Sequence, residues 1–373
     1  MSPGDCKPLK VGGQAVMEGV MMRSPKSFAV AVRRSGGQIV LREAPWRPIL
    51  GGWKFLRWPL LRGAVVLLES MVNGISALNF SARIAMADLE AQERAERGEA
   101  EQADPDAAPV DEETGKEPSD WVIWGTVAFA LALGIGLFIA LPHMAVWLGS
   151  ALVGRELTVD EFAFHAIVGL VKMGVFVGYI ALISLMKDVR RVFMYHGAEH
   201  QSIYAYEAGQ PLTVDSARQH KPMHPRCGTT FLIMVIALSI LVFSLVFPGL
   251  IWLLGEPTGV GWLDHLIYIL TKLPLLFPIA GLAYEFQRLT SRFLDRWWAR
   301  ALAWPGMFVQ RLTTRPPTDD QLEVALASLH KALWRERVGL PDEAAEPKIE
   351  TFDNFEAVIA AHAEAGQSLA GVA

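Results

Sequence analysis

Four long apolar stretches limit what this chain can fold into more than any other feature of its sequence. They cover residues 121–149, 162–186, 230–254 and 262–284, and each reaches the roughly 20 residues that a helix needs to cross a hydrocarbon core. The 373 residues are 52% hydrophobic and 20% charged, which suits membrane helices with water-soluble flanks. The sequence therefore predicts a mainly α-helical, polytopic membrane protein with about four transmembrane helices in a domain spanning residues 121–285.

Basic residues predict how these helices are oriented. Lys and Arg are concentrated in the connection 187–229 and after residue 285, whereas Arg155 is the one basic residue in the other two connections. Loops rich in Lys and Arg stay in the cytoplasm. We therefore expect a multi-pass protein of the inner (plasma) membrane, with the 187–229 connection and both termini in the cytoplasm.

Residues 49–90 are predicted to form a helix that lies at the interface or packs in the bundle. The stretch 59–82 is apolar, but Glu69, Asn73 and Ser76 recur at helical spacing and form a polar stripe. A fifth crossing would also invert the orientation just derived. We therefore expect that this helix does not cross the membrane.

Residues 91–120 are predicted to be a disordered acidic linker. They are rich in Glu, Asp, Gln, Ala and Pro and have no apolar periodicity, a composition that buries too little surface to fold. Much of the acid behind the formal net charge of −5 lies here. The charge pattern gives no indication of nucleic-acid binding, so the expected partner is the lipid bilayer.

The segments on either side of the membrane domain are predicted to be cytoplasmic. Residues 1–48 form a small β-containing module, because β-formers at 28–34 and 38–43 flank the turn residues Ser35-Gly36-Gly37. Residues 286–340 form an interfacial helix with Arg every four residues, and then an amphipathic helix that opens with a capping box at Thr318-Asp319-Asp320-Gln321. The Ala-rich residues 341–373 form a tail.

The motif His196-x-x-Glu199-His200 stands where the second apolar stretch ends. If the helix continues through it, His196 and His200 lie one turn apart on the same side, so two imidazoles can converge on one metal ion. Glu199 could then accept a proton from a water activated by the metal. This order of residues is the inverted zincin pattern, in which two His ligands and an adjacent Glu support hydrolysis.

A second cluster ends the same connection, where His224 and Cys227 precede the third apolar stretch. Because the second and third spans form a hairpin, His224 and Cys227 return to the level of the first motif, and four potential ligands can meet. Imidazole and thiolate ligands favour Zn²⁺. Fe²⁺ or Mn²⁺ remains open if a carboxylate of Glu207 or Glu285 completes the shell.

Three interpretations of these residues compete. A structural site would use His196, His200, His224 and Cys227 together, whereas a catalytic site would keep one position open for water. In the third, the polar residues merely cap helix ends in the headgroup region. Glu199 favours catalysis, because a closed structural site has no need of a carboxylate beside its ligands.

Four stretches of this chain resemble the YqhQ-like family of bacterial membrane proteins, a family of unknown function described as predicted metal-dependent enzymes. They are VGGQAVMEGVMMRSP at 11–25, YHGAEH at 195–200, HPRCGTTF at 224–231 and YEFQR at 284–288. The resemblance implies a membrane location and one site formed by the His, Glu and Cys residues above. It also implies that Gln14, Glu18 and Arg23 could cover that site from the cytoplasm.

The resulting hypothesis is a membrane-embedded metal-dependent hydrolase whose site opens at the cytoplasmic interface, with Glu199 as general base and His196, His200, His224 and Cys227 as ligands. Its substrate, at the membrane interface, and its oligomeric state are left open by the sequence. The alternative is a non-enzymatic protein, either a scaffold with a structural metal or a transporter. A transporter would use the ionisable residues inside the spans, His165, Lys172 and Lys272.

Overall fold

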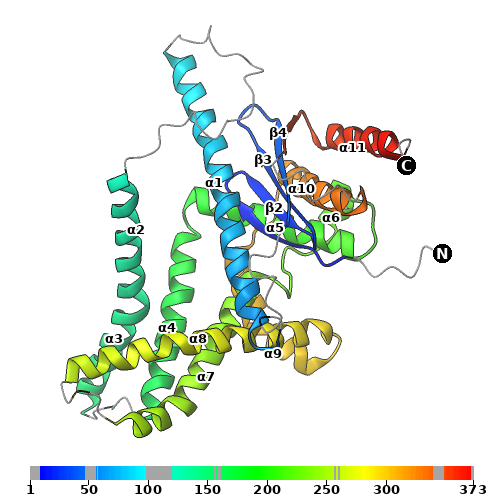
Figure 1. Ribbon diagram of the computed structural model, residues 1–373. Helices are drawn as coiled ribbons and strands as arrows, with labels where there is room; N and C mark the ends of the chain where they lie inside the picture. The colour runs from blue at the N-terminus through cyan, green and yellow to red at the C-terminus, as the bar shows by residue number, and fades with distance from the viewer. Residues whose placement is uncertain are drawn as a thin grey trace.

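The computed structural model describes residues 9–46, 56, 58–97, 120–154, 157, 161–255, 258, 261–338 and 348–370. A β-sheet with helices on its faces lies beside a group of long helices (Figure 1). The expected linker 91–120 lies mostly outside the described residues. Residues 91–96, however, are helical, so that part of the linker prediction is wrong.

The sheet has five antiparallel strands in the order β1-β2-β3-β4-β5. They are β1 Gly12–Val16, β2 Gly19–Arg23, β3 Ser27–Arg33, β4 Ile39–Pro45 and β5 Lys348–Phe352. The predicted hairpin is confirmed: Val32 lies opposite Val40, and Gly37 in the turn has a φ of 92°, which favours glycine.

The expected tail 341–373 contributes to this sheet, because β5 pairs with β4, opposing Thr351 to Val40. Helix α11 (Phe355–Ala370) follows the strand and buries Phe355 and Val358 in the core. Period-two alternation in five residues is too short to stand out in an Ala-rich segment. The two ends of the described chain therefore meet in one sheet.

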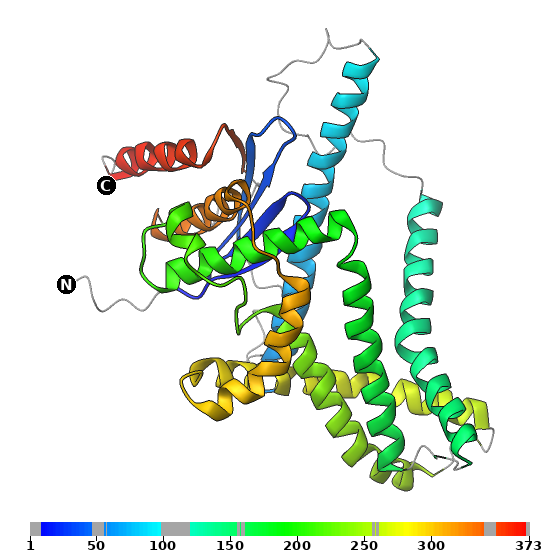
Figure 2. The ribbon, with the colours of Figure 1, turned by 180° about the vertical axis from the view of Figure 1, so that it is seen from behind.

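Helices cover both faces of the sheet (Figure 2). On one face, α5 (Lys187–Glu207) and α10 (Asp319–Val338) pack against Ala29, Ala31 and their neighbours. On the other, α1 (Arg62–Glu96) packs against Val30 and Val32. This follows from the period of two in a strand, which points successive side chains to opposite faces. The short helix α6 (Val214–Arg218) lies beside α5 and α10.

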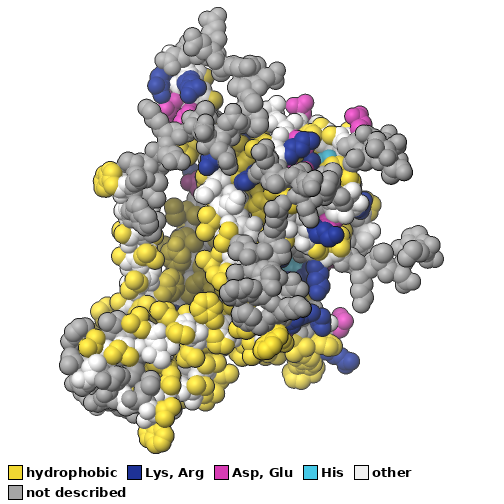
Figure 3. Space-filling view, in the orientation of Figure 1, with side chains coloured by type: hydrophobic (Ala, Val, Ile, Leu, Met, Phe, Trp, Pro, Cys, Tyr) yellow, Lys and Arg dark blue, Asp and Glu magenta, His cyan; other side chains and the backbone are white. Residues whose placement is uncertain are grey.

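The long helices belong to a membrane protein. Helix α2 (Asp120–Ile135) continues through a π-helical turn η3 (Gly136–Ala140) into α3 (Leu141–Val153), and α4 (Phe162–Ile183), α7 (Gly228–Leu254), α8 (Gly261–Arg292) and α9 (Trp297–Thr313) complete the set. Hydrophobic side chains dominate the surface around α3, α7 and α8 (Figure 3).

Within the described residues, four helices are long and apolar enough to cross a membrane: Arg62–Glu96, Ala128–Leu152, Phe162–Ile183 and Gly228–Leu253. The number of candidate spans agrees with the sequence prediction, but the four helices are not all the predicted ones. Helix α1 meets the criterion, although we expected it not to cross. The predicted fourth span 262–284 lies in α8. Several side chains in the first turns of α8 are not among those described, so this span stays a prediction.

The second span does not continue into the His-containing motif as one helix. Helix α4 ends at Ile183, Met186 has an extended backbone with a ψ of 134°, and α5 begins at Lys187. Ser184, the residue that follows α4, donates its hydroxyl to the carbonyl of Ala181 (2.7 Å). The motif therefore lies on a separate helix that packs on the sheet, and the 187–229 connection is largely helical.

The interfacial helix predicted to begin at residue 286 is likewise two separate helical pieces. Helix α8 runs to Arg292, and α9 begins at Trp297. Ala299, Ala303 and Gly306 of α9 are buried, and Gly306 contacts Thr230 of α7. The predicted capping box at the start of α10 is confirmed in part, because the backbone N–H of Thr318 donates to Oε1 of Gln321 (3.0 Å).

A buried ion cluster fastens α10 to the sheet. Nζ of Lys331 lies 2.6 Å from Oε2 of Glu350 and 3.4 Å from Oε2 of Glu43, and Arg335 binds the other oxygen of Glu43 at 2.9 Å. The side chains of Lys331 and Glu43 are 2% and 4% exposed. Strands β4 and β5, from opposite ends of the described chain, thus both contact the ammonium group of Lys331.

We expect Lys331→Ala to lower the free energy of unfolding by about 3 kcal/mol, because it leaves Glu43 and Glu350 short of a partner in a buried place. Lys348, whose side chain is 67% exposed, also pairs with Glu350, and Lys348→Ala should cost at most about 1 kcal/mol. Unfolding of the detergent-purified protein followed by tryptophan fluorescence checks both. Equal effects of the two substitutions would contradict this account of the cluster.

Candidate functional site

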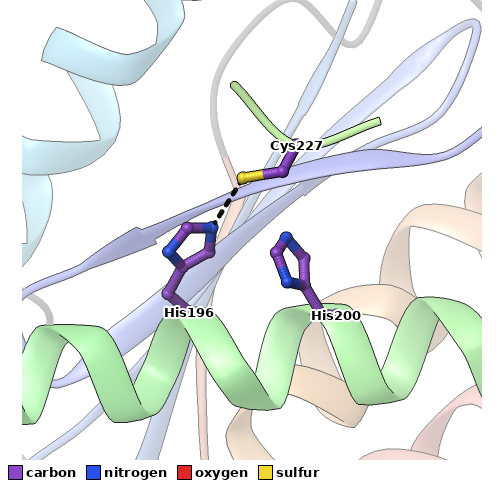
Figure 4. Close-up of side chains that lie close together, drawn as sticks. All are labelled: His196, His200 and Cys227. Atoms are coloured by element: carbon purple, nitrogen blue, oxygen red, sulfur yellow. Dashed lines mark hydrogen bonds between the residues drawn. The ribbon is translucent and has the colours of Figure 1, made fainter. Parts of the chain in front are cut away.

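Three side chains from two elements converge beside the sheet. Helix α5 presents His196 and His200 one turn apart, and Cys227 precedes the first residue of α7 (Figure 4). The potential ligand atoms of these three residues all lie within 4.8 Å of one another, and Nε2 of His196 lies 3.1 Å from Sγ of Cys227. The structure thus brings together three of the four predicted metal ligands.

Backbone carbonyls orient both imidazoles. Nδ1 of His196 lies 2.8 Å from the carbonyl oxygen of Thr313, and Nδ1 of His200 lies 2.7 Å from that of Pro222. A ring whose Nδ1–H donates to a carbonyl has its lone pair on Nε2, as metal-binding histidines commonly do. The hydrogen bond to Thr313 therefore leaves Nε2 of His196, which faces Cys227, as the nitrogen that can bind a metal once it has lost its proton.

The surroundings of Cys227 favour its thiolate. Burial by itself raises the pKa of the thiol, but His196 and His200 lower it well below the ordinary value. The backbone N–H of Thr229 points at Sγ (3.4 Å), and the start of a helix stabilises negative charge. Burial also lowers the pKa of His196, yet Cys227 and Glu199 raise it to about 9. An imidazolium and a thiolate therefore face each other.

Two glycines allow the close packing around these residues. A side chain at Gly197 would overlap the carbonyl oxygen of Arg315, so glycine lets α5 approach the backbone that orients His196. A Cβ at Gly13 in β1 would lie 2.8 Å from Cδ of Glu199. The sheet therefore closes directly over the Glu199 carboxyl group.

Glu199 is buried beside the three potential ligands. Its residue exposure is 5%, and Oε2 has no hydrogen-bond partner within the described residues. Burial raises the pKa of Glu199 to about 8, with a smaller opposite effect from His196. A carboxyl group with a free, buried oxygen at this place is able to take up or release a proton near neutral pH.

His224 lies next to this group but does not belong to it. Its ring centroid is 5.7 Å from that of His200, while its Nε2 lies 3.5 Å from Oε2 of Glu207. Burial lowers the pKa of His224 to about 4, so the ring is neutral. The predicted four-ligand set is therefore incomplete in the described residues, and Nε2 of His224 lies beside Glu207, which α5 carries two turns beyond His200.

The two carboxylates considered as extra ligands have other partners. Glu207 pairs with Arg226, and Glu285 pairs with Arg62 of α1. Neither belongs to the group of potential ligands found in the described part of the chain. Both instead bind cations around the loop that carries Cys227.

Two buried glutamines, which the motif analysis did not single out, hold that loop. Nε2 of Gln287 in α8 donates to the carbonyls of Pro225 and Cys227, each at 3.0 Å. Gln310 in α9 accepts from the N–H of His224 and donates to its carbonyl, each at 2.8 Å. Gln287 belongs to the YEFQR stretch and could have been found there, whereas Gln310 has no sequence signal among the aromatic residues of α9.

The segment expected to cover the site forms the β1–β2 hairpin, but not through the expected side chains. Gln14 packs on Gly74 of α1, Arg23 stacks over Trp46 at 3.9 Å, and Glu18 pairs with Arg191. The hydroxyl of Tyr195 also donates to Glu18 (3.3 Å). Gly13, rather than these residues, contacts Glu199.

The ionisable residues of the membrane helices gather elsewhere, around Phe247 of α7. The ring of His165 lies edge-on to Phe247 with centroids 5.3 Å apart, and Nζ of Lys272 lies 4.6 Å from the same ring centroid. Lys172 is close enough to act electrostatically on Lys272. These residues form a group separate from the His and Cys side chains.

Comparison with known proteins places the chain in a family. The DUF1385 family, described as a protein of unknown function, matches residues 58–335. The chain is 31% identical over 332 residues to "Uncharacterized protein YqhQ" of Bacillus subtilis (strain 168), covering 87% of this chain and 93% of that protein. No solved structure matches. The resemblance to the YqhQ-like proteins is thus confirmed, and the chain belongs to the DUF1385 family.

Proposed function

We propose that this chain is a membrane-bound, metal-dependent hydrolase. One observation carries the proposal: His196, His200 and Cys227 offer ligand atoms within 4.8 Å of one another, with the carboxyl group of Glu199 buried beside them. Unpaired polar groups are costly to bury, so an orphaned Glu199 oxygen next to a thiolate and two imidazoles supports a site for a cation and water.

The donor set fits Zn²⁺ best. Two imidazole nitrogens and one thiolate are typical of zinc, and catalytic zinc sites commonly have three protein ligands and one open position. The turn of His224 toward Glu207 leaves that fourth position without a protein ligand among the described residues. When bound, Zn²⁺ supplies Lewis acidity that activates water near neutral pH. This favours the catalytic over the structural interpretation.

The protein groups then have distinct roles. Thr313 and Pro222 orient the two imidazoles through their carbonyls. Glu199 holds the proton that leaves the attacking water and returns it to the leaving group, as a general base and then a general acid. Contact with Gly13 excludes bulk water from that carboxyl group.

We infer that the sheet and the site lie on the cytoplasmic side. Pairing of β4 with β5 requires an even number of membrane crossings between them. Helix α8 ends beside the start of α7, where Gln287 contacts the carbonyl of Cys227, so α8 returns across the bilayer that α7 crosses. Together with α2–α3 and α4 this makes four crossings.

Helix α1 is then the candidate that does not cross. Ala77, Phe80 and Ile84 near the middle of α1 pack on the sheet, and we infer that the sheet lies in water. A crossing by α1 would also make the number odd. The basic residues near α5 and from the end of α8 onward support the cytoplasmic assignment for the sheet side. They also support a site at the membrane surface, where it would meet a substrate in the lipid interface.

Metal content tests the proposal directly. We expect about one zinc ion per purified chain, because three preorganised donors bind Zn²⁺ tightly, and a His196→Ala, His200→Ala double variant should lose nearly all of it. Inductively coupled plasma mass spectrometry measures both. His220→Ala serves as the control. His220 lies in the same connection, but its ring binds the side chain of Gln210 and is not one of the proposed ligands. If the wild-type protein contains no metal after zinc supplementation, the proposal is wrong.

Substitution of Glu199 distinguishes an enzyme from a scaffold with a structural metal. Glu199→Gln should keep the zinc but lower the hydrolysis of fluorogenic ester and peptide substrates by about 100-fold or more, because it removes the general base. Gly13→Ala should lower the activity similarly, because the added methyl group would displace the Glu199 side chain. Gly12→Ala is the matched control: a Cβ at Gly12 meets nothing within 4 Å, so the activity should be unchanged. Full activity of Glu199→Gln would contradict the catalytic role.

Zinc affinity should rise with pH by about tenfold per unit from pH 6.5 to 8.5. Cys227 is already a thiolate and His200 has a lowered pKa, so the one proton to displace is that of His196, whose pKa is about 9. Below that pKa the proton competes with the metal. Calorimetry in two buffers of different ionisation enthalpy should detect about one proton released; an affinity independent of pH would refute this assignment.

A further inference from the structure

A group of cations lies next to the loop that carries Cys227. This basic patch consists of Lys10, Arg62, Arg226, Arg288 and Arg292. Arg62 and Arg288 both pair with Glu285, Arg292 lies one turn after Arg288 on α8, and Gln287 of the same helix binds the carbonyl of Pro225, next to Arg226. Lys10 lies close enough for the charges of the four arginines to lower its pKa, in addition to the effect of partial burial. The five side chains therefore share one region although they come from four segments of the chain. The N–H of Leu9 donates to the hydroxyl of Tyr206 (3.0 Å), which holds Lys10 near the end of α5.

The patch has more cations than its carboxylate partners neutralise. Glu285 pairs with Arg62 and, at 3.9 Å, with Arg288, while Glu207 pairs with Arg226. Five cations against two carboxylates leave three positive charges in excess. Within the described residues, no carboxylate oxygen lies within 4 Å of Lys10 or Arg292.

Exposed apolar side chains border the patch. Leu289 and Phe293 follow Arg288 on the same stretch of chain and are 46% and 44% exposed. Trp297, Trp304 and Phe308 of α9 are also exposed. Hydrophobic side chains adjoin Lys and Arg in the region of α9 (Figure 3). Aromatic residues beside basic ones are typical of protein that lies at the headgroup level of a membrane.

The patch is also joined to the candidate centre. Arg226 directly precedes Cys227, and its partner Glu207 contacts His224. Gln287, one residue before Arg288, holds the carbonyls of Pro225 and Cys227. An anion bound by the patch would therefore lie beside the loop that contributes the thiolate.

We propose that the basic patch binds the phosphate of an anionic membrane lipid next to the His196, His200 and Cys227 group. The excess of positive charge recognises the phosphate, and the exposed aromatic residues select a lipid over a soluble phosphate. Where the proposed hydrolase function also holds, a phosphate-bearing lipid is its substrate class; that second part rests on the proposed function.

Native mass spectrometry of the full-length chain in detergent tests the site with phosphatidylglycerol and phosphatidylcholine. The wild type should bind phosphatidylglycerol at least about tenfold more tightly. A Lys10→Gln, Arg288→Gln, Arg292→Gln triple variant should weaken that binding by about a hundredfold, because each basic residue near an anionic headgroup contributes roughly a factor of five. Equal binding of the two lipids, or a triple variant that keeps the preference, would overturn the proposal.

Two controls make the outcome specific. Arg83→Gln, Arg94→Gln, Arg97→Gln removes three cations from the exposed part of α1, where Arg94 and Arg97 pair with glutamates of the same helix, and should keep the preference. Inorganic phosphate at the same concentration should not displace phosphatidylglycerol; equal competition would mean a soluble phosphate site and overturn the assignment to a lipid.

The lipid experiment also separates this inference from the proposed function. The His196→Ala, His200→Ala variant retains the whole patch, so it should keep the preference for phosphatidylglycerol without bound metal. Lipid selectivity in a wild type that binds no metal would support the patch and reject the hydrolase. Bound metal without lipid selectivity would reject the patch alone.

Discussion

The contact between His196 and Cys227 joins the two halves of this protein. His196 belongs to α5, which packs on the sheet, while Cys227 caps the start of α7, which is long and apolar enough to cross a membrane. The two side chains approach to 3.1 Å, and next to His196 the glycine at 197 lets α5 lie against the backbone at Arg315. The sheet layer and a helix apolar enough to cross a membrane thus share one buried polar pair, whose geometry depends on both.

The pairing of β4 with β5 constrains the rest of the architecture. A strand from the end of the described chain lies beside one from its beginning, so every membrane crossing between them must be matched by a return. The buried cluster of Lys331, Arg335, Glu43 and Glu350 reinforces this closure. Hydropathy counts α1 among the possible spans, but it takes no account of the sheet on which Ala77, Phe80 and Ile84 pack.

The sequence predicted those features that depend on local pattern. Apolar length identified three of the four described helices that could cross a membrane. Ser35-Gly36-Gly37 identified a hairpin, and helical spacing placed His196 and His200 on one side of a helix. Features that depend on long-range contacts were missed. β5 pairs with the edge of β4, and Nε2 of His224 lies 3.5 Å from Oε2 of Glu207 and outside the group of potential ligands. Neither partner is visible in local periodicity.

The arrangement around Glu199 favours chemistry over simple structural support. A carboxyl group buried beside a thiolate is costly, because burial and the negative Cys227 both raise its pKa. A scaffold would gain by replacing Glu199 with an apolar residue, since α5 is already held by Thr313, Pro222 and the sheet. Gly13 instead leaves room for the side chain. A group that destabilises its surroundings and has a place made for it is better explained by proton transfer than by packing.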